Sequence, residues 1–245
     1  MADVLMQIMP GIRIVASGWL GYSLTADQDC TVYLVHDGGD AVLVDAGSGL
    51  ATRSIVRHLA GTVVSRIFLT HAHADHAAGA SGLAARAGAR VLGSPECAHI
   101  VATGDEDAAG LITARAAGVY PPEVRLRPVP VEEIWAARLT VGSLALDALP
   151  TAGHAAGHCC YITKIDDARV AFTGDLVFSR GRVAVLGTPD TSLHALHASL
   201  ETLMRLKPDV LLPGHGEVVL RDATRHVRRA LDFFDVGQLP PGLLR

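Results

Sequence analysis

The sequence has 245 residues, 49% hydrophobic and only 4% aromatic, so a large core must be built mainly from Ala, Val, Leu and Ile. The formal net charge is −4, and the only lysines are Lys164 and Lys207. This composition argues against a nucleic-acid partner, which rewards a basic surface. No apolar run is long enough to cross a bilayer, and the N-terminal segment lacks a signal-peptide pattern. We therefore predict a cytoplasmic protein without a membrane partner.

Short apolar runs predict ten strands, most of them continuous rather than alternating, as is typical of strands covered on both faces. In chain order they are Ile12–Val15, Thr31–Val35, Ala41–Val44, Ile67–Thr70, Arg90–Leu92, Leu144–Leu149, Cys160–Ile165, Val170–Thr173, Arg182–Leu186 and Val210–Leu212.

Helical periodicity predicts five helices between and after these strands. They are Thr52–Leu59, His76–Ala87, Asp105–Ala117, Ser192–Leu206 and Asp222–Phe234. The apolar stripes of the last two are Leu193, Leu196, Leu200 and Leu203, and Ala223, Val227, Leu231 and Phe234. The proline-rich stretch Gly118–Trp135 is the least regular segment and is interpreted as an ordered crossing. Two strand-rich halves with flanking helices predict an α/β fold layered helix–sheet–sheet–helix, as a single domain over residues 1–245.

The cysteines do not form a disulfide framework. Two of the four are adjacent, and a chain of this length needs no covalent staples. We interpret all four as reduced, small hydrophobic residues. They are Cys30, Cys97, Cys159 and Cys160.

The segment that carries the chemistry is an apolar strand followed by the pattern H-x-H-x-D-H. His71 and His73 are two residues apart, so in an extended loop both side chains point to one side. Asp75 and His76 come from the next turn and reach a second point nearby. Imidazole and carboxylate donors suit Zn²⁺, Mn²⁺ or Fe²⁺. A helix start capped by aspartate would explain Asp75 but not three histidines.

Three further strands each end in a residue that can bind metal, next to a glycine that lets the backbone approach closely. His154 follows Leu149-Pro-Thr-Ala-Gly, Asp175 follows Ala171-Phe-Thr-Gly, and His215 follows Val210-Leu-Leu-Pro-Gly. Donors at strand ends predict a site in a groove between sheets. Alone each signal is weak, because Gly-His and Gly-Asp turns are common, but together with the first motif they complete two donor sets.

On these motifs the sequence resembles the metallo-β-lactamase fold superfamily, in its branch similar to glyoxalase II. The resemblance runs from the Val44-Asp45-Ala-Gly turn to His215. It implies a four-layer αββα sandwich of two mixed sheets. It also implies two Zn²⁺ per chain, with iron and manganese as further candidates. One metal would be held by His71, His73 and His154, the other by Asp75, His76 and His215, with Asp175 bridging both. Asp45 matches an aspartate that supports the ligand loop without being a ligand.

The chemistry of such a site is hydrolysis. Two metals about 3.5–4 Å apart share a water and lower its pKa towards neutrality, and the resulting hydroxide attacks a carbonyl carbon. Asp175 would neutralise and space the metals, and Asp75 would orient the hydroxide or pass a proton to the leaving group. We therefore assign catalytic roles to Asp75 and Asp175, and expect a small-molecule acyl substrate. The sequence leaves the oligomeric state open.

The remaining histidines fit other roles. His158 is expected to support the site rather than to bind metal. His194 and His197 lie three apart on a predicted helix beside Glu201, and a solvated face explains them better than a metal pair. The others have no partner pattern and are not expected to bind metal: His36, His58, His99 and His226.

One segment near the N-terminus leaves two interpretations open. Trp19, Leu20 and Tyr22 lie in a glycine-flanked segment where relatives place a loop over the groove. Lining of the substrate groove and packing into the core are equally good interpretations of it.

Four departures from the family narrow the activity. Zinc β-lactamases carry Cys or Ser at the place of Asp175, so antibiotic hydrolysis is not expected. Only 30 residues follow His215, so we do not expect the helical domain that grips glutathione in glyoxalase II. Phe178 stands where many lactonases of quorum signals carry a proton-donating Tyr. Nuclease members need a basic arm that this composition lacks. Hydrolysis of a small or medium ester, thioester or lactone remains.

Two alternatives stay open from the sequence. A persulfide dioxygenase-like enzyme would use one iron held by His71, His154 and Asp175, and Ser179-Arg-Gly-Arg182 matches that family's Arg/Gly-rich stretch loosely. A metal-free binding module of the same fold is the other. The complete set of five His and two Asp argues against it, because such a cluster is costly to bury without metal.

Overall fold

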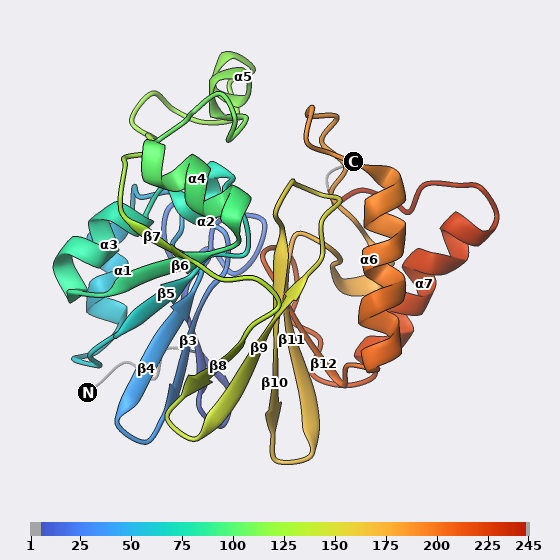
Figure 1. Ribbon diagram of the computed structural model, residues 1–245, viewed down its shortest axis with the longest axis horizontal. Coiled ribbons are helices and arrows are strands. Elements are labelled where there is room, and N and C mark those ends of the chain that lie inside the picture. Colours follow the sequence, from blue (N-terminus) through green and yellow to red (C-terminus); the bar gives the residue numbers. More distant parts are fainter. Residues whose placement is uncertain (1–5, 244–245) are drawn as a thin grey trace.

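The structure is a computed structural model that describes residues 6–243. Two sheets pack face to face at its centre, and helices cover the outer face of each (Figure 1). The first sheet is antiparallel from β1 to β4 and parallel from β4 to β7. Its strands, in spatial and chain order, are β1 (Gln7–Met9), β2 (Ile12–Ala16), β3 (Val32–Asp37), β4 (Asp40–Val44), β5 (Arg66–Phe68), β6 (Arg90–Gly93) and β7 (Val131–Glu133).

The second sheet has the order β12-β11-β10-β9-β8. Only the β11–β12 pair is parallel. Since β9 and β11 both run antiparallel to β10 between them, β9, β11 and β12 share one direction. The strands are β8 (Arg138–Val141), β9 (Leu144–Pro150), β10 (Cys159–Ile165), β11 (Ala168–Gly174) and β12 (Val210–Pro213).

The helices form the two outer layers (Figure 1). Five precede β7 and belong to the side of the first sheet: α1 (Thr52–His58), α2 (Ala74–Ala77), α3 (Ala80–Ala87), α4 (Pro95–Thr103) and α5 (Leu111–Ala116). The long α6 (Leu193–Leu206) and α7 (Ala223–Asp235) cover the second sheet, and a short 3₁₀ helix spans Ser179–Gly181. The predicted αββα sandwich is confirmed.

Three apolar layers hold the sandwich together, and strand periodicity decides which side chain enters which layer. Within β3, Leu34 points to the helices of the first half, whereas Tyr33 points to the second sheet. The Tyr33 ring meets Phe172 edge-on, with centroids 5.4 Å apart. Because both faces of these strands are buried, their sequences are continuous apolar runs. A third layer packs α6 and α7 on the outer face of the second sheet through Leu200 and Val227, among others.

The predicted strands are present with one exception. Arg182–Leu186 is not a strand, because its only pairing among the described residues is an isolated bridge from Val183 to Gly242. The short strands β1, β7 and β8 were not predicted. Their sequences carry little apolar pattern, and pairing with a longer neighbour defines them.

Several helix predictions need correction. The segment His76–Ala87 is two helices, because Gly79 interrupts it. Of Asp105–Ala117, only Leu111–Ala116 is α-helical. Leu193 is 41% exposed, since it is the first helical residue and the buried stripe begins one turn later at Leu196.

The helix α4 was missed although its ends carry recognisable signals. Ser94 caps it by accepting a hydrogen bond from the amide of Cys97, Pro95 occupies its first turn, and Gly104 ends it in a left-handed conformation. Throughout residues 6–243, none of the helices combines the length and the apolar character that crossing a bilayer requires. All four cysteines are buried free thiols, as expected.

Gly79 joins the first sheet to the segment that carries the H-x-H-x-D-H pattern. Its amide donates to the carbonyl of Gly47 at 2.8 Å, and a Cβ atom here would overlap the carbonyl oxygen of Ala46. Ala46 in turn donates its amide to the carbonyl of His76 at 2.8 Å. The close approach therefore fixes the helical turn of His76 against the end of β4.

We expect Gly79→Ala to lower the free energy of unfolding by about 1–3 kcal/mol, because the added methyl group forces the two backbones apart. Chemical denaturation of the apoprotein measures this effect. Gly39→Ala is the matched control, since a Cβ at Gly39 meets no atom of the described residues within 4 Å and its φ is not positive. Equal stability of both variants would contradict the role of the close approach.

Candidate metal centre

The residues of the four sequence motifs meet at one edge of the sandwich. In Figure 1 this is the upper edge, opposite the β3–β4 and β10–β11 hairpins. The loop after β5 carries the H-x-H-x-D-H pattern, and the loops after β9, β11 and β12 carry His154, Asp175 and His215. Parallel directions of β9, β11 and β12 bring these three residues to the same edge of the second sheet.

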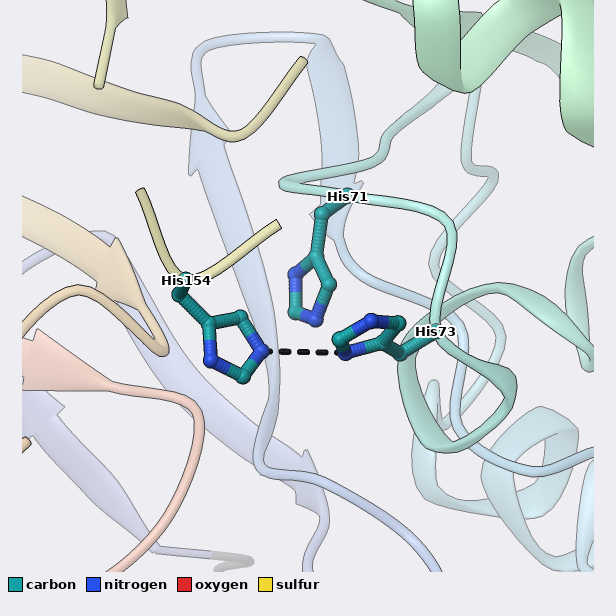
Figure 2. A group of neighbouring side chains, drawn as sticks. All are labelled: His71, His73 and His154. Atoms are coloured by element: carbon teal, nitrogen blue, oxygen red, sulfur yellow. Dashed lines mark hydrogen bonds between the residues drawn. The ribbon is translucent and has the colours of Figure 1, made fainter. Parts of the chain in front are cut away.

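His71, His73 and His154 form the first donor group. Their ring nitrogens include a set whose members all lie within 4.8 Å of one another, and all three residues are buried. The Nε2 of His154 is 3.0 Å from the Nδ1 of His73. Figure 2 shows the three rings converging from two separate loops. This arrangement presents three imidazole nitrogens to a common point.

Asp75, His76 and His215 form the second donor group. The Nε2 of His215 lies 3.0 Å from the Oδ2 of Asp75, and the Nε2 of His76 lies 3.8 Å from the same oxygen. The ring centroids of His76 and His215 are 5.4 Å apart. The two groups adjoin, because the ring centroids of His71 and His76 are 4.2 Å apart and both residues group with Asp175.

Asp175 lies between the two groups. Its Oδ1 is 3.2 Å from the Nε2 of His76, and its Oδ2 is 3.7 Å from the Nε2 of His154 and 3.6 Å from the Nε2 of His215. One carboxylate therefore contacts residues of both donor groups, as a bridging ligand must.

The donor atoms fit a bound cation. His71 Nε2, His76 Nε2 and Asp175 Oδ1 are buried and have no hydrogen-bond partner among residues 6–243. Unsatisfied buried polar atoms are costly and rare, and here they all face into the same cluster. A set of five imidazoles and two carboxylates is the donor chemistry of zinc, iron or manganese.

The protonation states of His71, His154 and Asp175 suit metal binding. At His76 and His215 the nearby acidic groups outweigh burial and raise the pKa, so a metal ion would displace a proton there. Burial lowers the pKa of His154 to about 4, with the neighbouring histidines contributing. Burial and the surrounding histidines also hold the pKa of His71 well below its usual value. Burial favours the neutral form of Asp175, but the charges of His215 and His76 outweigh it and lower the pKa of the carboxyl. Neutral imidazole and ionised carboxylate are the forms that bind metal.

Hydrogen bonds from behind orient the donor residues. Asp45 accepts from the amide of Thr70 at 2.8 Å, and its Oδ2 is 2.8 Å from the Nδ1 of His76. The Nδ1 of His154 lies 2.9 Å from the carbonyl oxygen of Ala184. Each contact leaves the Nε2 of its imidazole free to face the cluster.

His158 lies behind Asp175 rather than among the grouped donor atoms. Its Nε2 accepts a hydrogen bond from the amide of Asp175 at 3.2 Å, and its Nδ1 is 3.0 Å from the hydroxyl of Thr151. Burial lowers the pKa of His158 to about 3, so the ring stays a neutral acceptor. Of the two helix histidines, His194 is exposed, whereas His197 stacks on Phe234 at 5.1 Å between centroids.

The segment with Trp19 and Tyr22 has one exposed aromatic side chain and one that packs into the core. Trp19 is 59% exposed, whereas Tyr22 packs against the layer between the sheets. The segment is tied to the loop of His215, because the amide of Gly216 donates to the carbonyl of Leu20 at 2.7 Å. Phe178 is buried, with its ring centroid 6.2 Å from that of His215.

Sequence reasoning missed one residue at this site. The Oδ2 of Asp190 lies 3.6 Å from the Nε2 of His73, whose Nδ1 contacts His154. Asp190 belongs to no motif, and it comes from an irregular segment whose position follows from tertiary packing alone.

A cavity of about 760 Å³ opens beside His73 and is bounded by Asp190. It lies between α4, the segment before α5 and the loop that carries Asp190. Among residues 6–243, no lysine or arginine lines it. Its lining residues with titratable side chains are Glu96, His99, Asp105, Asp107 and Asp190.

An αββα sandwich with clustered His and Asp donors at one edge defines a class of metalloproteins, and sequence comparison gives the family. Residues 26–215 match the family model described as the metallo-beta-lactamase superfamily. This chain therefore belongs to the metallo-beta-lactamase superfamily.

Relatives and solved structures agree with this assignment. A hydroxyacylglutathione hydrolase of Acidiphilium cryptum (strain JF-5) is 34% identical over 202 residues, which are 81% of this chain and 70% of that protein. The thioesterase pkgB of Emericella nidulans is 27% identical over 89% of this chain and 55% of that protein. The chain spans 55–70% of the length of the first four curated relatives it matches. A metallo-beta-lactamase of Cronobacter sakazakii has the same fold, with a TM-score of 0.71, 22% identity and coverage of 94% of this chain and 92% of that chain.

The position of His158 leads to a prediction about metal affinity. In His158→Ala the amide of Asp175 loses its acceptor, so we expect metal binding to weaken about 10–100-fold. Titration against a chelating competitor measures this affinity. His194→Ala is the control and should bind metal like the wild type, because His194 is exposed and belongs to none of the donor groups. Loss of a metal equivalent in the control would show that the ligand set is misassigned.

Proposed function

We propose that this chain is a dinuclear metal-dependent hydrolase of thioesters and activated esters. The observation that carries the proposal is the placement of Asp175 in contact with both donor groups. A buried carboxylate shared by two complete three-residue sets suits two metal ions and not one. Relatives named hydroxyacylglutathione hydrolase and thioesterase support thioester cleavage as the chemistry.

Two of the groups that the donor atoms form support the ligand assignment, and a third, of His71, His76 and Asp175, lies between them. We assign the first group to one metal, the second group to the other and Asp175 to both. Zinc is the proposed metal, since histidine and carboxylate ligands in this number suit it, and iron or manganese would fit the same donors. The sets are His71, His73 and His154, and Asp75, His76 and His215.

When bound, two metal ions supply a water activated at neutral pH and a Lewis acid for the acyl carbonyl. The protein residues position these functions. Asp175 offsets the charge of the two sites, and Asp75 lies at the second group, where its carboxylate can accept a proton and pass it on. Phe178, beside His215, offers no hydroxyl for a leaving group. Leaving groups that depart without protonation, such as thiolates, therefore suit this site.

The cavity beside His73 bears on the substrate. Glutathione carries two carboxylates, and a wall that contains Glu96, Asp105, Asp107 and Asp190 without a lysine or arginine repels them. We therefore propose thioesters whose thiol portion is uncharged or positively charged, unlike the substrate that the names of the bacterial relatives indicate.

The setting of the proposed reaction is the cytoplasm. Four buried free thiols fit a reducing compartment. The partner we propose is a small-molecule acyl substrate, and neither nucleic acid nor membrane takes part in the reaction.

Metal content tests the proposal against a dioxygenase with one iron. We expect protein purified without added metal, or reloaded with zinc after chelation, to hold two equivalents per chain, because both donor sets are complete. Elemental analysis of the active fraction gives the number. Asp175→Ala should abolish turnover and reduce the metal content. Full activity with a single iron, lost on reloading with zinc, would replace the hydrolase by the dioxygenase.

A substrate panel tests the reaction. We expect kcat/KM to fall from thioesters and aryl esters to alkyl lactones, with β-lactams negligible, because good leaving groups need no acid. Among thioesters, those of an uncharged thiol should exceed those of glutathione.

Phe178→Tyr should raise lactone hydrolysis specifically. Phe234→Tyr, on the far helix α7, is its control and should leave the ranking unchanged. If alkyl lactones are the best wild-type substrates, the argument from Phe178 is wrong.

A further inference from the structure

The loop between β9 and β10, residues 151–158, is anchored to both halves of the molecule. On the side of α6, the amide of Ser192 donates to the carbonyl of Gly153 at 2.8 Å. On the other side, the hydroxyl of Ser94 donates to the carbonyl of Gly157 at 2.5 Å. Ser94 follows β6 and precedes α4, so this bond links a loop of the second sheet to the first half of the molecule.

Ser94 is fully buried, and its hydroxyl makes two contacts. Besides donating to Gly157, it accepts from the amide of Cys97 at 3.3 Å and so caps α4. Gly157 has a φ of +66°, and a Cβ there would lie 2.6 Å from the Oγ of Ser94. The loop therefore approaches Ser94 as closely as a glycine allows, and the end of α4 fixes the hydroxyl that meets it.

His158 follows Gly157 directly and supports the carboxylate that contacts both donor groups. Its Nε2 accepts from the amide of Asp175 at 3.2 Å, and its Nδ1 lies 3.0 Å from the hydroxyl of Thr151. A Cβ at Gly174 would lie 2.7 Å from the same Nε2, so the ring packs against the backbone that leads into Asp175. A shift of the loop at Gly157 therefore moves the support of Asp175.

Capping alone does not account for the contact between Ser94 and Gly157. A cap needs only an acceptor, whereas the bond to Gly157 needs a hydroxyl hydrogen. Ser192 shows the difference, because it caps α6 by accepting from the amide of Ala195 at 3.2 Å. Its link to the loop is made by the main chain and not by the hydroxyl.

We propose that Ser94 is a positioning residue for the metal centre, whose hydroxyl holds the loop at Gly157 so that His158 stays against the amide of Asp175. This role rests on the proposed function, since it requires Asp175 to bind metal. It gives the end of β6 a share in orienting the bridging carboxylate. Because Asp175 contacts both donor groups, loss of this hydroxyl should weaken the binding of both metals.

The test is Ser94→Ala, titrated as apoprotein with zinc against a chelating competitor. We expect both binding steps to weaken about tenfold, because the variant displaces His158 without removing it. The double variant Ser94→Ala/His158→Ala should bind zinc like His158→Ala alone, since a residue that acts through His158 has no effect once the ring is gone. A residue that acts independently of His158 would add its own loss.

Ser192→Ala is the matched control. It removes the cap of α6 and keeps the main-chain link to Gly153, so both zinc affinities should equal those of the wild type. Wild-type affinities in Ser94→Ala, additive losses in the double variant or an equal loss in Ser192→Ala would overturn the role of Ser94. A wild-type chain that holds one zinc would overturn the two-metal centre, and the same variants would then decide the role of Ser94 at that single metal.

Discussion

The interaction on which the rest of the structure depends is the contact of one buried carboxylate with two groups of imidazoles. Asp175 lies within 3.2–3.7 Å of His76, His154 and His215, and two of the surrounding ring nitrogens have no hydrogen-bond partner among the described residues. Such a cluster is costly to bury unless a cation compensates it. Every segment around it must therefore hold its donor atom in place against repulsion between like groups, and the fold provides that restraint at the ends of its strands.

The restraint comes from strand direction first and from hydrogen bonds second. Parallel directions of β9, β11 and β12 bring the residues after each strand to one edge, and the packing of the two sheets brings the loop after β5 to meet them. The final orientation depends on polar groups behind the donors. Asp45 illustrates this: it joins the amide of Thr70, at the start of the ligand loop, to His76 at its end. The backbone contact between Gly79 and Gly47 holds the same turn from the other side.

Strand direction and local hydrogen bonding together explain how much of the fold and the site could be predicted from the sequence. The H-x-H-x-D-H pattern is local, so its spacing alone indicates two separate donor points, and the layered fold follows from continuous apolar runs such as that of β3. The break at Gly79 was missed because helical periodicity runs across it, whereas the amide of Gly79 bonds to the carbonyl of Gly47 and leaves the helical pattern. The strand predicted at Arg182–Leu186 failed because an apolar run needs a neighbour to pair with, and here one isolated bridge is all that forms. Asp190 carries no pattern, since an irregular segment brings it to the site.

The donor atoms and the walls around them come from different parts of the fold, and this affects how activity can vary. The donor groups sit at strand ends whose geometry is set by the core, so the metal chemistry is tied to the stability of the sandwich. The walls of the cavity beside His73 come from α4, from the segment between α4 and α5 and from the loop of Asp190. Changes in these walls alter the charge of the cavity without moving a donor atom. On the proposed function, the chain can therefore select a thiol other than glutathione, because metal binding and substrate charge are governed by different parts of the molecule.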